Sequence, residues 1–294
     1  MLAALLGAAC SAPDVLYVGA ANPSDPLAVP LAWQEHWYEH NQRLALVAWD
    51  EDVAIYYDQD VDRAQTAWLF SYASAIWRYT VASYGALGPG RLYVILHQGR
   101  YLGCHYDTHF SLAHDGRNVI DCGFSQAAVP SDATVLVPHM AALIVESTAR
   151  GRDGAPARNL WEVSKWAEFY RYDLYRGIGS STDADSFYAL WTGDGYSDSF
   201  PRAGTHWFRD WFYPLWRDHG GAQVMNRFFT LLARDFPVQG QRYARDMNWG
   251  EFVHFMSGAA ATDLKAMATA AFGWPSEWEA QLAAARADFP GVTY

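Results

Sequence analysis

The segment from residue 133 to residue 149 is apolar along almost its whole length and has a helical pattern. A helix with so few polar positions has to be buried on most of its sides. The chain before this segment has strand-like runs, whereas residues 151–294 have helical patterns only. The sequence therefore predicts an α+β fold, in which a small mixed β-sheet with helices precedes a helical subdomain.

Three short runs rich in β-branched and aromatic residues are predicted as strands, at 53–58, 91–97 and 118–122. Apolar residues at intervals of three and four predict a helix over 61–83. The helices expected after the central one lie at 160–175, 206–219, 222–235, 249–256, 263–272 and 276–288. Residues 177–201 are rich in Gly, Ser and Asp, which favours a loop.

The chain is acidic, with 32 acidic and 21 basic residues and a formal net charge of −11. It has no cluster of Lys and Arg, so it lacks the positive surface with which proteins bind nucleic acids or anionic lipids. With 51% hydrophobic residues it is also too apolar to be a disordered chain. We therefore expect a folded protein that has no nucleic-acid partner.

The first ten residues form an apolar run that ends at Cys10. This run is shorter than the roughly 20 residues that span a bilayer, and it resembles the end of a bacterial lipoprotein signal. The absence of basic residues before it indicates a translation start upstream of Met1. Residues 11–32 are rich in proline and predict an extended tether. We expect an exported protein, lipid-anchored at Cys10, with one domain at 33–294 whose halves are 33–150 and 151–294.

Cys104 and Cys122 are the two cysteines that remain when Cys10 carries a lipid. In an exported protein such a pair most simply forms a disulfide that closes a short loop. In a cytosolic protein two free thiols would be expected instead. The disulfide prediction therefore depends on the prediction of export.

The central helix and the helix after it carry a resemblance to a known enzyme family. Their residues are Thr134-Val-Leu-Val-Pro-His-Met-Ala-Ala-Leu-Ile-Val-Glu146 and Leu160-Trp-Glu-Val-Ser-Lys-Trp-Ala-Glu-Phe-Tyr170. They resemble the gluzincin-type zincin metallopeptidases, in which a helix after a small sheet carries H-E-x-x-H and a second helix supplies a third zinc ligand. The resemblance implies a zincin-like fold with a substrate cleft between the two halves.

Position by position, the chain keeps only one residue of the zincin zinc site. His139 stands at the first ligand, Met140 at the catalytic Glu and Leu143 at the second His. Val163 or Ser164, depending on the alignment, stands at the third ligand. One imidazole cannot hold a zinc ion that needs three protein ligands, and no carboxylate remains to activate water. The resemblance therefore implies a zincin fold with a degenerate site and no cofactor.

Two other groups of residues leave an active hydrolase as the alternative. His105 and His109 are four residues apart and could bind zinc together with His139. Glu168 and Asp173 flank aromatic residues and could act as the two carboxylates of a glycoside hydrolase. The plainer interpretation of both groups is a solvated loop and ordinary salt links.

These observations favour an exported, lipid-anchored, non-catalytic protein of metallopeptidase-like fold that binds or scaffolds a partner. The expected partner is a peptide, a protein or a glycan at the cell surface, and the expected membrane contact is the lipid anchor alone. Zinc content separates this hypothesis from the alternative, because an active metallopeptidase retains about one zinc ion per chain.

Overall fold

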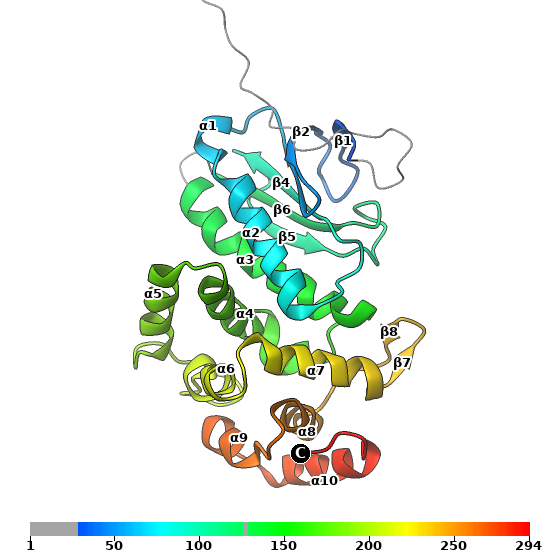
Figure 1. Cartoon of the computed structure of the whole chain (residues 1–294), viewed down its shortest axis with the longest axis vertical. Helices are drawn as coiled ribbons and strands as arrows, with labels where there is room; N and C mark the ends of the chain where they lie inside the picture. Colours follow the sequence, from blue (N-terminus) through cyan, green and yellow to red (C-terminus); the bar gives the residue numbers. More distant parts are fainter. Residues whose placement is uncertain (1–28, 126–128) are drawn as a thin grey trace, which may run out of the picture.

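The structure is a computed structural model that describes residues 29–125 and 129–294. A six-stranded sheet with the strand order β1-β2-β3-β4-β6-β5 forms one end of the molecule (Figure 1). The strands are β1 (Ala32–Gln34), β2 (Arg43–Trp49), β3 (Val53–Tyr57), β4 (Leu92–Gln98), β5 (Gly103–Asp107) and β6 (Asn118–Phe124). The neighbours β3, β4 and β6 run parallel, whereas β1, β2 and β5 run antiparallel to the strands beside them.

The three parallel strands lie in the middle of the sheet because their residues are buried on both faces. Every residue of β3 and β6 is buried, and only the last residue of β4 is partly exposed. Continuous apolar runs of this kind are typical of parallel strands with both faces covered. The strands predicted from the sequence are these three.

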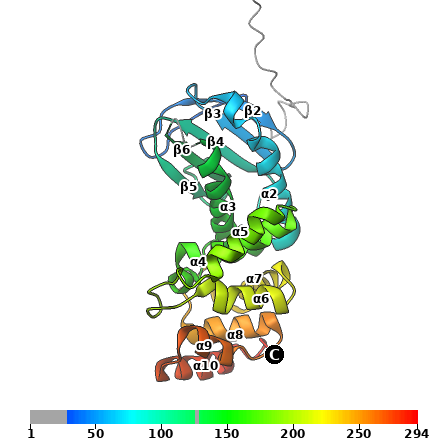
Figure 2. The same ribbon diagram turned by 90° about the vertical axis from the view of Figure 1, so that its left-hand side faces the viewer.

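Helices cover one face of the sheet, and the segment around Val29, Trp33 and Trp37 covers the other. The helices are α1 (Arg63–Thr66), α2 (Leu69–Tyr84) and α3 (Val129–Thr148) (Figures 1 and 2). The apolar side chains of α2 and α3 join Val94 and Ile120 of the sheet in the main core. On the opposite face, Trp33 packs edge-on against Tyr56 and Tyr93 in a second, smaller core.

The second half of the chain is mainly helical. Its helices are α4 (Arg158–Gly177), α5 (Ser181–Thr192), α6 (Tyr213–Asp218), α7 (Ala222–Asp235), α8 (Trp249–Ala260), α9 (Lys265–Phe272) and α10 (Ser276–Asp288), with a π-helical turn at Phe208–Phe212. Figure 2 shows α8, α9 and α10 at the end of the molecule away from the sheet. Aromatic side chains fill the space between these helices, and the main core runs from the sheet into them without a break.

Several elements differ from those expected. The strands β1, β2 and β5 were not expected, and α5 lies within residues 177–201, which favoured a loop. The helical half also contains a short hairpin of β7 (Val238–Gln239) and β8 (Arg242–Tyr243). Two of these elements have weak apolar patterns, since each residue of β5 is at least partly exposed and α5 buries only Ala184 and Phe187, whereas β2 has the alternating burial of an ordinary strand.

The expected signal segment with Cys10 lies outside the described residues, as does most of the expected tether at 11–32. The end of that tether belongs to the fold, because Val29 is buried and the Pro30 carbonyl accepts a hydrogen bond from the Tyr56 hydroxyl at 2.7 Å. The packed domain therefore begins a few residues before 33. In the described part of the chain, no helix has the length and apolar composition needed to cross a membrane.

Cys104 of β5 and Cys122 of β6 lie opposite each other in the antiparallel ladder, with their sulfur atoms at disulfide distance. A bond between them ties the partly exposed edge strand β5 to the buried strand β6. The neighbouring residues His105 and Asp121 also form a cross-strand pair, on the other face of the sheet. The disulfide therefore fixes the register at which this second pair meets.

We expect reduction of this disulfide to lower the free energy of unfolding by about 3 kcal/mol, because the bond closes a short loop in the unfolded chain. The melting temperature should fall by several degrees. Differential scanning calorimetry with and without reductant measures the change, and the Cys104→Ser/Cys122→Ser variant should melt at the same temperature in both conditions. Two thiols that alkylate freely in unreduced protein from an oxidising compartment would contradict the prediction.

Candidate metal centre

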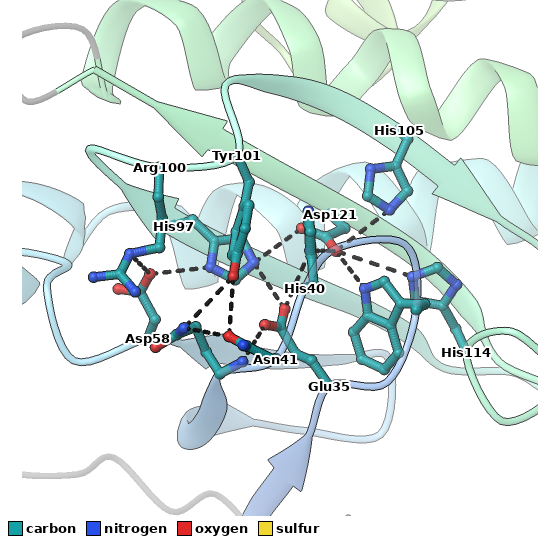
Figure 3. Close-up of polar contacts among 12 residues, drawn as sticks. Glu35, His40, Asn41, Asp58, His97, Arg100, Tyr101, His105, His114 and Asp121 are labelled. Carbon is teal, nitrogen blue, oxygen red and sulfur yellow. Dashed lines mark hydrogen bonds and ion pairs between the residues drawn. The ribbon is translucent and has the colours of Figure 1, made fainter.

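A group of acidic and histidine side chains lies on the sheet face opposite α2 and α3 (Figure 3). His97 follows Tyr93 and Ile95 on β4 at strand spacing, and Asp121 follows Val119 on β6, so all of these side chains point to the second face. On β5, His105 pairs directly with Asp121. The alternation of strand residues therefore gathers polar side chains at one end of an otherwise apolar face.

The segment after β1 brings further ligand types to this group. A tight turn at Tyr38, which has a φ of 51°, lets the amide of His40 donate to the Trp37 carbonyl at 3.0 Å. Glu35 Oε2 accepts a hydrogen bond from the Gln42 backbone amide at 2.8 Å. The Trp37 indole donates to Asp121 Oδ2 at 2.9 Å. These contacts hold Glu35 and His40 over the sheet.

Glu35, His40, His97 and Asp121 form a compact set of four possible ligands, whose ligand atoms all lie within 4.8 Å of one another. Glu35 Oε1 is 3.0 Å from His97 Nε2 and 3.3 Å from His40 Nδ1. The Asp121 carboxylate lies 3.2 Å from each of the same two nitrogens. The side chains of Glu35, His97 and Asp121 have no exposed surface, and that of His40 is 9% exposed.

The ligand atoms of this set are close together, yet they do not form ordinary hydrogen bonds. Glu35 Oε1, His40 Nδ1, His97 Nε2 and Asp121 Oδ1 are buried and have no hydrogen-bond partner among the described residues. Buried polar atoms without partners are rare in native proteins, because each costs about 1–3 kcal/mol. Their short separations without hydrogen bonds indicate atoms directed at a common point between them. A bound cation would satisfy all four.

His97 of this set and the neighbouring His114 each have one ring nitrogen hydrogen-bonded to a carboxylate, as is typical of histidines that bind a metal through the other nitrogen. His97 Nδ1 lies 3.0 Å from Asp58 Oδ2, and His114 Nδ1 lies 2.8 Å from Asp107 Oδ2. A carboxylate on one ring nitrogen fixes the tautomer and leaves the lone pair of the other nitrogen free for a metal. In both rings the nitrogen directed at the centre is Nε2.

The centre is strongly negative without a cation. Burial alone would lower the pKa of His97, but the neighbouring carboxylates of Asp121, Asp58 and Glu35 raise that pKa to about 11. Burial acts to raise the pKa of Asp121, yet the surrounding imidazoles lower it far below its usual range. Buried carboxylates need positive charge beside them, from protonated imidazoles or from a metal ion. Mixed imidazole and carboxylate ligands suit zinc and related transition metals.

The alternative zinc set of His105, His109 and His139 is not gathered in the structure. His105 lies on β5 rather than on a helix, 3.3 Å from Asp121 Oδ2. The ring of His109 lies against Gly88 and Asn118. His139 is on α3, which covers the opposite face of the sheet. Of the three, only His105 lies beside a residue of the candidate metal centre, Asp121.

The residues that resemble the zincin motif lie on α3 and α4, two helices that pack against each other. The Trp166 indole of α4 donates to the Ala142 carbonyl of α3 at 2.7 Å. Met140 and Leu143 are buried in the main core, whereas Val163 is 49% exposed and Ser164 is partly exposed. Burial and the nearby Arg171 guanidinium lower the pKa of His139.

Glu168 and Asp173, the alternative carboxylate pair, have separate partners. Asp173 Oδ2 accepts hydrogen bonds from the hydroxyls of Tyr79 and Tyr84, and Oδ1 accepts one from the Trp216 indole. Glu168 Oε1 lies 3.4 Å from Lys165 Nζ. Asp173 therefore has the contacts of a buried group that joins helices, and its oxygens are already occupied.

Glu168 should make the stability of the protein depend on pH. Burial raises the pKa of Glu168 to about 8, against the opposing effect of Lys165. A raised pKa in the folded state stabilises the fold below the ordinary Glu pKa, and this contribution is lost as pH rises toward 8. Glu168→Gln removes this titratable group. The melting temperature of the variant minus that of the wild type should therefore increase by roughly 5 °C or more from pH 5 to pH 9.

Thermal melts of both proteins across this pH range measure the effect. Glu162→Gln is the matched control, because Glu162 is exposed on the same helix and should keep a constant difference from the wild type. A Glu168→Gln difference that is equally constant with pH would show that this carboxyl ionises normally.

No protein-family model, no curated protein and no solved structure matches the chain. The assignment of the centre therefore depends on its own geometry. Sequence reasoning missed Glu35, His40, His97 and Asp121 as ligands. The available signal was a polar residue at a strand position where the pattern calls for an apolar one, as at His97 and Asp121.

Proposed function

We propose that this protein is a metalloprotein that binds a divalent transition-metal ion, zinc in the first place, through Glu35, His40, His97 and Asp121. The observation that carries the proposal is the convergence of four buried ligand atoms that have no hydrogen-bond partner among the described residues. Four protein ligands and little exposed surface are typical of a zinc site that stabilises a fold.

The ion would join parts of the chain that are far apart in sequence. Glu35 and His40 come from the segment after β1, whereas His97 and Asp121 come from two central strands. Metal binding to such a set contributes directly to folding, because the ligands are not together in the unfolded chain. The ring of Tyr101 stacks on His40 with a centroid distance of 3.8 Å and helps to cover the site.

Zinc binding to metal-free protein tests the proposal, by isothermal titration calorimetry with zinc alone as the probe. The His97→Ala variant should lose at least 100-fold in affinity, because it removes a central ligand and its bond to Asp58. The matched control is His139→Ala, which removes the histidine of the zincin-like motif and should bind zinc like the wild type. Wild-type protein that binds no zinc, or binding lost in the control alone, would refute the proposal.

A second candidate function is the binding of a peptide or glycan beside the zincin-like helix. A pocket of about 320 Å³ next to α3, α4 and α5 favours it. Arg171 lines this pocket, with its guanidinium 5.0 Å from the Phe187 ring. Binding on a glycan or peptide array that disappears in Trp191→Ala would support this function, and a wild type that binds nothing on either array would refute it.

We also propose that the protein is exported and lipid-anchored at Cys10. A cross-strand pair of cysteines at disulfide distance fits an oxidising compartment. Fractionation of cells that express the full chain tests it, since Cys10→Ala should leave the membrane fraction. Equal cytosolic recovery of both proteins would exclude a lipid anchor.

A further inference from the structure

The ligand set described above leaves two neighbouring histidines unused. His105 Nε2 and His114 Nε2 are buried atoms without a hydrogen-bond partner in the described chain, and both are directed at Asp121. We propose that His105, His114 and Asp121 hold a second divalent ion, so that Asp121 bridges two ions. This inference rests on the proposed function, since Asp121 is shared by both sets.

The second set has the geometry of a metal site in its own right. His105 Nε2 lies 3.3 Å from Asp121 Oδ2, and His114 Nε2 lies 4.0 Å from the same oxygen. The three ligand atoms lie within 4.8 Å of one another. Asp107 holds the other nitrogen of His114 at 2.8 Å, which keeps Nε2 directed at the centre.

The Asp121 carboxylate is placed to bridge. Its Oδ1 lies 3.2 Å from His97 Nε2. Its Oδ2 lies 3.3 Å from His105 Nε2 and 4.0 Å from His114 Nε2, and it is also 3.2 Å from His40 Nδ1 of the first set. Figure 3 shows Asp121 between His97 on one side and the pair His105 and His114 on the other. A carboxylate with one oxygen on each ion is a common element of two-metal sites, whose ions are about 3.5–4 Å apart.

The charge of the centre also favours more than one ion. Four carboxylates lie in contact with its histidines, those of Glu35, Asp58, Asp107 and Asp121, and the Arg100 guanidinium beside Asp58 offsets one of their charges. Two divalent ions bring four positive charges, so the imidazoles can stay neutral, as metal ligation requires. One ion alone leaves buried negative charge that protonated histidines would have to balance.

The second site differs from the first in its access to solvent. The His105 side chain is 30% exposed, and its ring packs against Tyr38, which is 70% exposed. Three protein ligands leave a coordination position that water or a small anion can take. The second ion is therefore the one at which an external ligand would bind.

Metal stoichiometry tests this inference, with Co²⁺ as the probe because its visible spectrum reports each site. Metal-free wild-type protein should bind two Co²⁺ ions, and His105→Ala should bind one. The control His36→Ala changes a half-exposed histidine outside both sets and should still bind two. Azide should change the Co²⁺ spectrum of the wild type but not that of His105→Ala.

The outcomes separate the two proposals. A wild type that saturates at one ion, with His105→Ala also at one, overturns the second site and leaves the first. A wild type that binds no ion overturns both. Two ions in His105→Ala show that the second ion lies elsewhere and overturn the assignment of its ligands. Because the wild-type stoichiometry is itself decisive, the test does not depend on how well the variant folds.

Discussion

Asp121→Asn is expected to remove both metal ions and to leave less than a tenth of the zinc bound to the wild type after the same dialysis. Asp121 is the only residue that belongs to both ligand sets in the described chain. An amide is a weak ligand for zinc, and it brings no charge to balance the ion. Zinc per chain, measured by mass spectrometry against protein concentration, gives the result directly.

The size of Asn keeps the steric fit of this variant close to that of the wild type. Its side-chain oxygen can still accept the 2.9 Å hydrogen bond from Trp37. Asp115→Asn is the matched control, because Asp115 contacts Trp33 and His36 nearby but belongs to neither set. Zinc retained in Asp121→Asn at the wild-type level would exclude a bridging role for this carboxylate.

Removal of metal from the wild type is expected to lower the melting temperature by about 10 °C. A ligand at a thousand times its dissociation constant stabilises the folded state by about 4 kcal/mol, and each kcal/mol shifts the melting temperature of a chain this size by about 2–4 °C. Scanning calorimetry in zinc and in chelator measures the shift. His97→Ala should show a much smaller one.

Hydrogen exchange locates the effect within the fold. Without metal, Glu35 and His40 lose the ion that joins them to the strands, so the segment after β1 should exchange faster. Helix α8 should keep its protection because it lies at the far end of the molecule (Figure 1). A chelator that leaves both the melting temperature and the exchange of residues 33–42 unchanged would contradict a stabilising metal ion.

The middle of the sheet could be predicted from the sequence because it depends on local patterns. The runs that form β3, β4 and β6 are mainly apolar. The helix predicted over 61–83 is present as α1 and α2, which are separated at Ala67 and Trp68. The mixed α/β composition follows from these elements. Whether the fold is that of the zincins stays a proposal, supported by the packing of α3 on α4.

The edges of the sheet could not be predicted in the same way. Residues 103–116 contain two glycines, and three histidines with charged residues nearby, which favour a loop when read locally. The strand β5 forms because β6 offers it a pairing edge and because Cys104 lies opposite Cys122. Pairing partners of this kind are set by tertiary contacts, which a local pattern does not contain.

The candidate metal centre was missed because its ligands follow strand geometry rather than helix geometry. His105 and His109 have the spacing of two ligands one helical turn apart, which is a pattern visible in a sequence. On a strand, alternate residues share a face, so His105 and Asp107 point to the same side and His109 lies beyond the end of β5. Glu35 and His40 reach the site only through packing of the first segment on the sheet, which no spacing rule predicts.

The most direct test of the metal centre is anomalous diffraction at the zinc absorption edge from crystals of the full chain grown with zinc. We expect two peaks, one among Glu35, His40 and His97 and one between His105 and His114, with the Asp121 carboxylate between them. A single peak in the first position would support the site of Glu35, His40 and His97 and contradict the proposed second site. An absence of zinc at Asp121, or zinc bound instead beside His139 on α3, would contradict the metal centre itself.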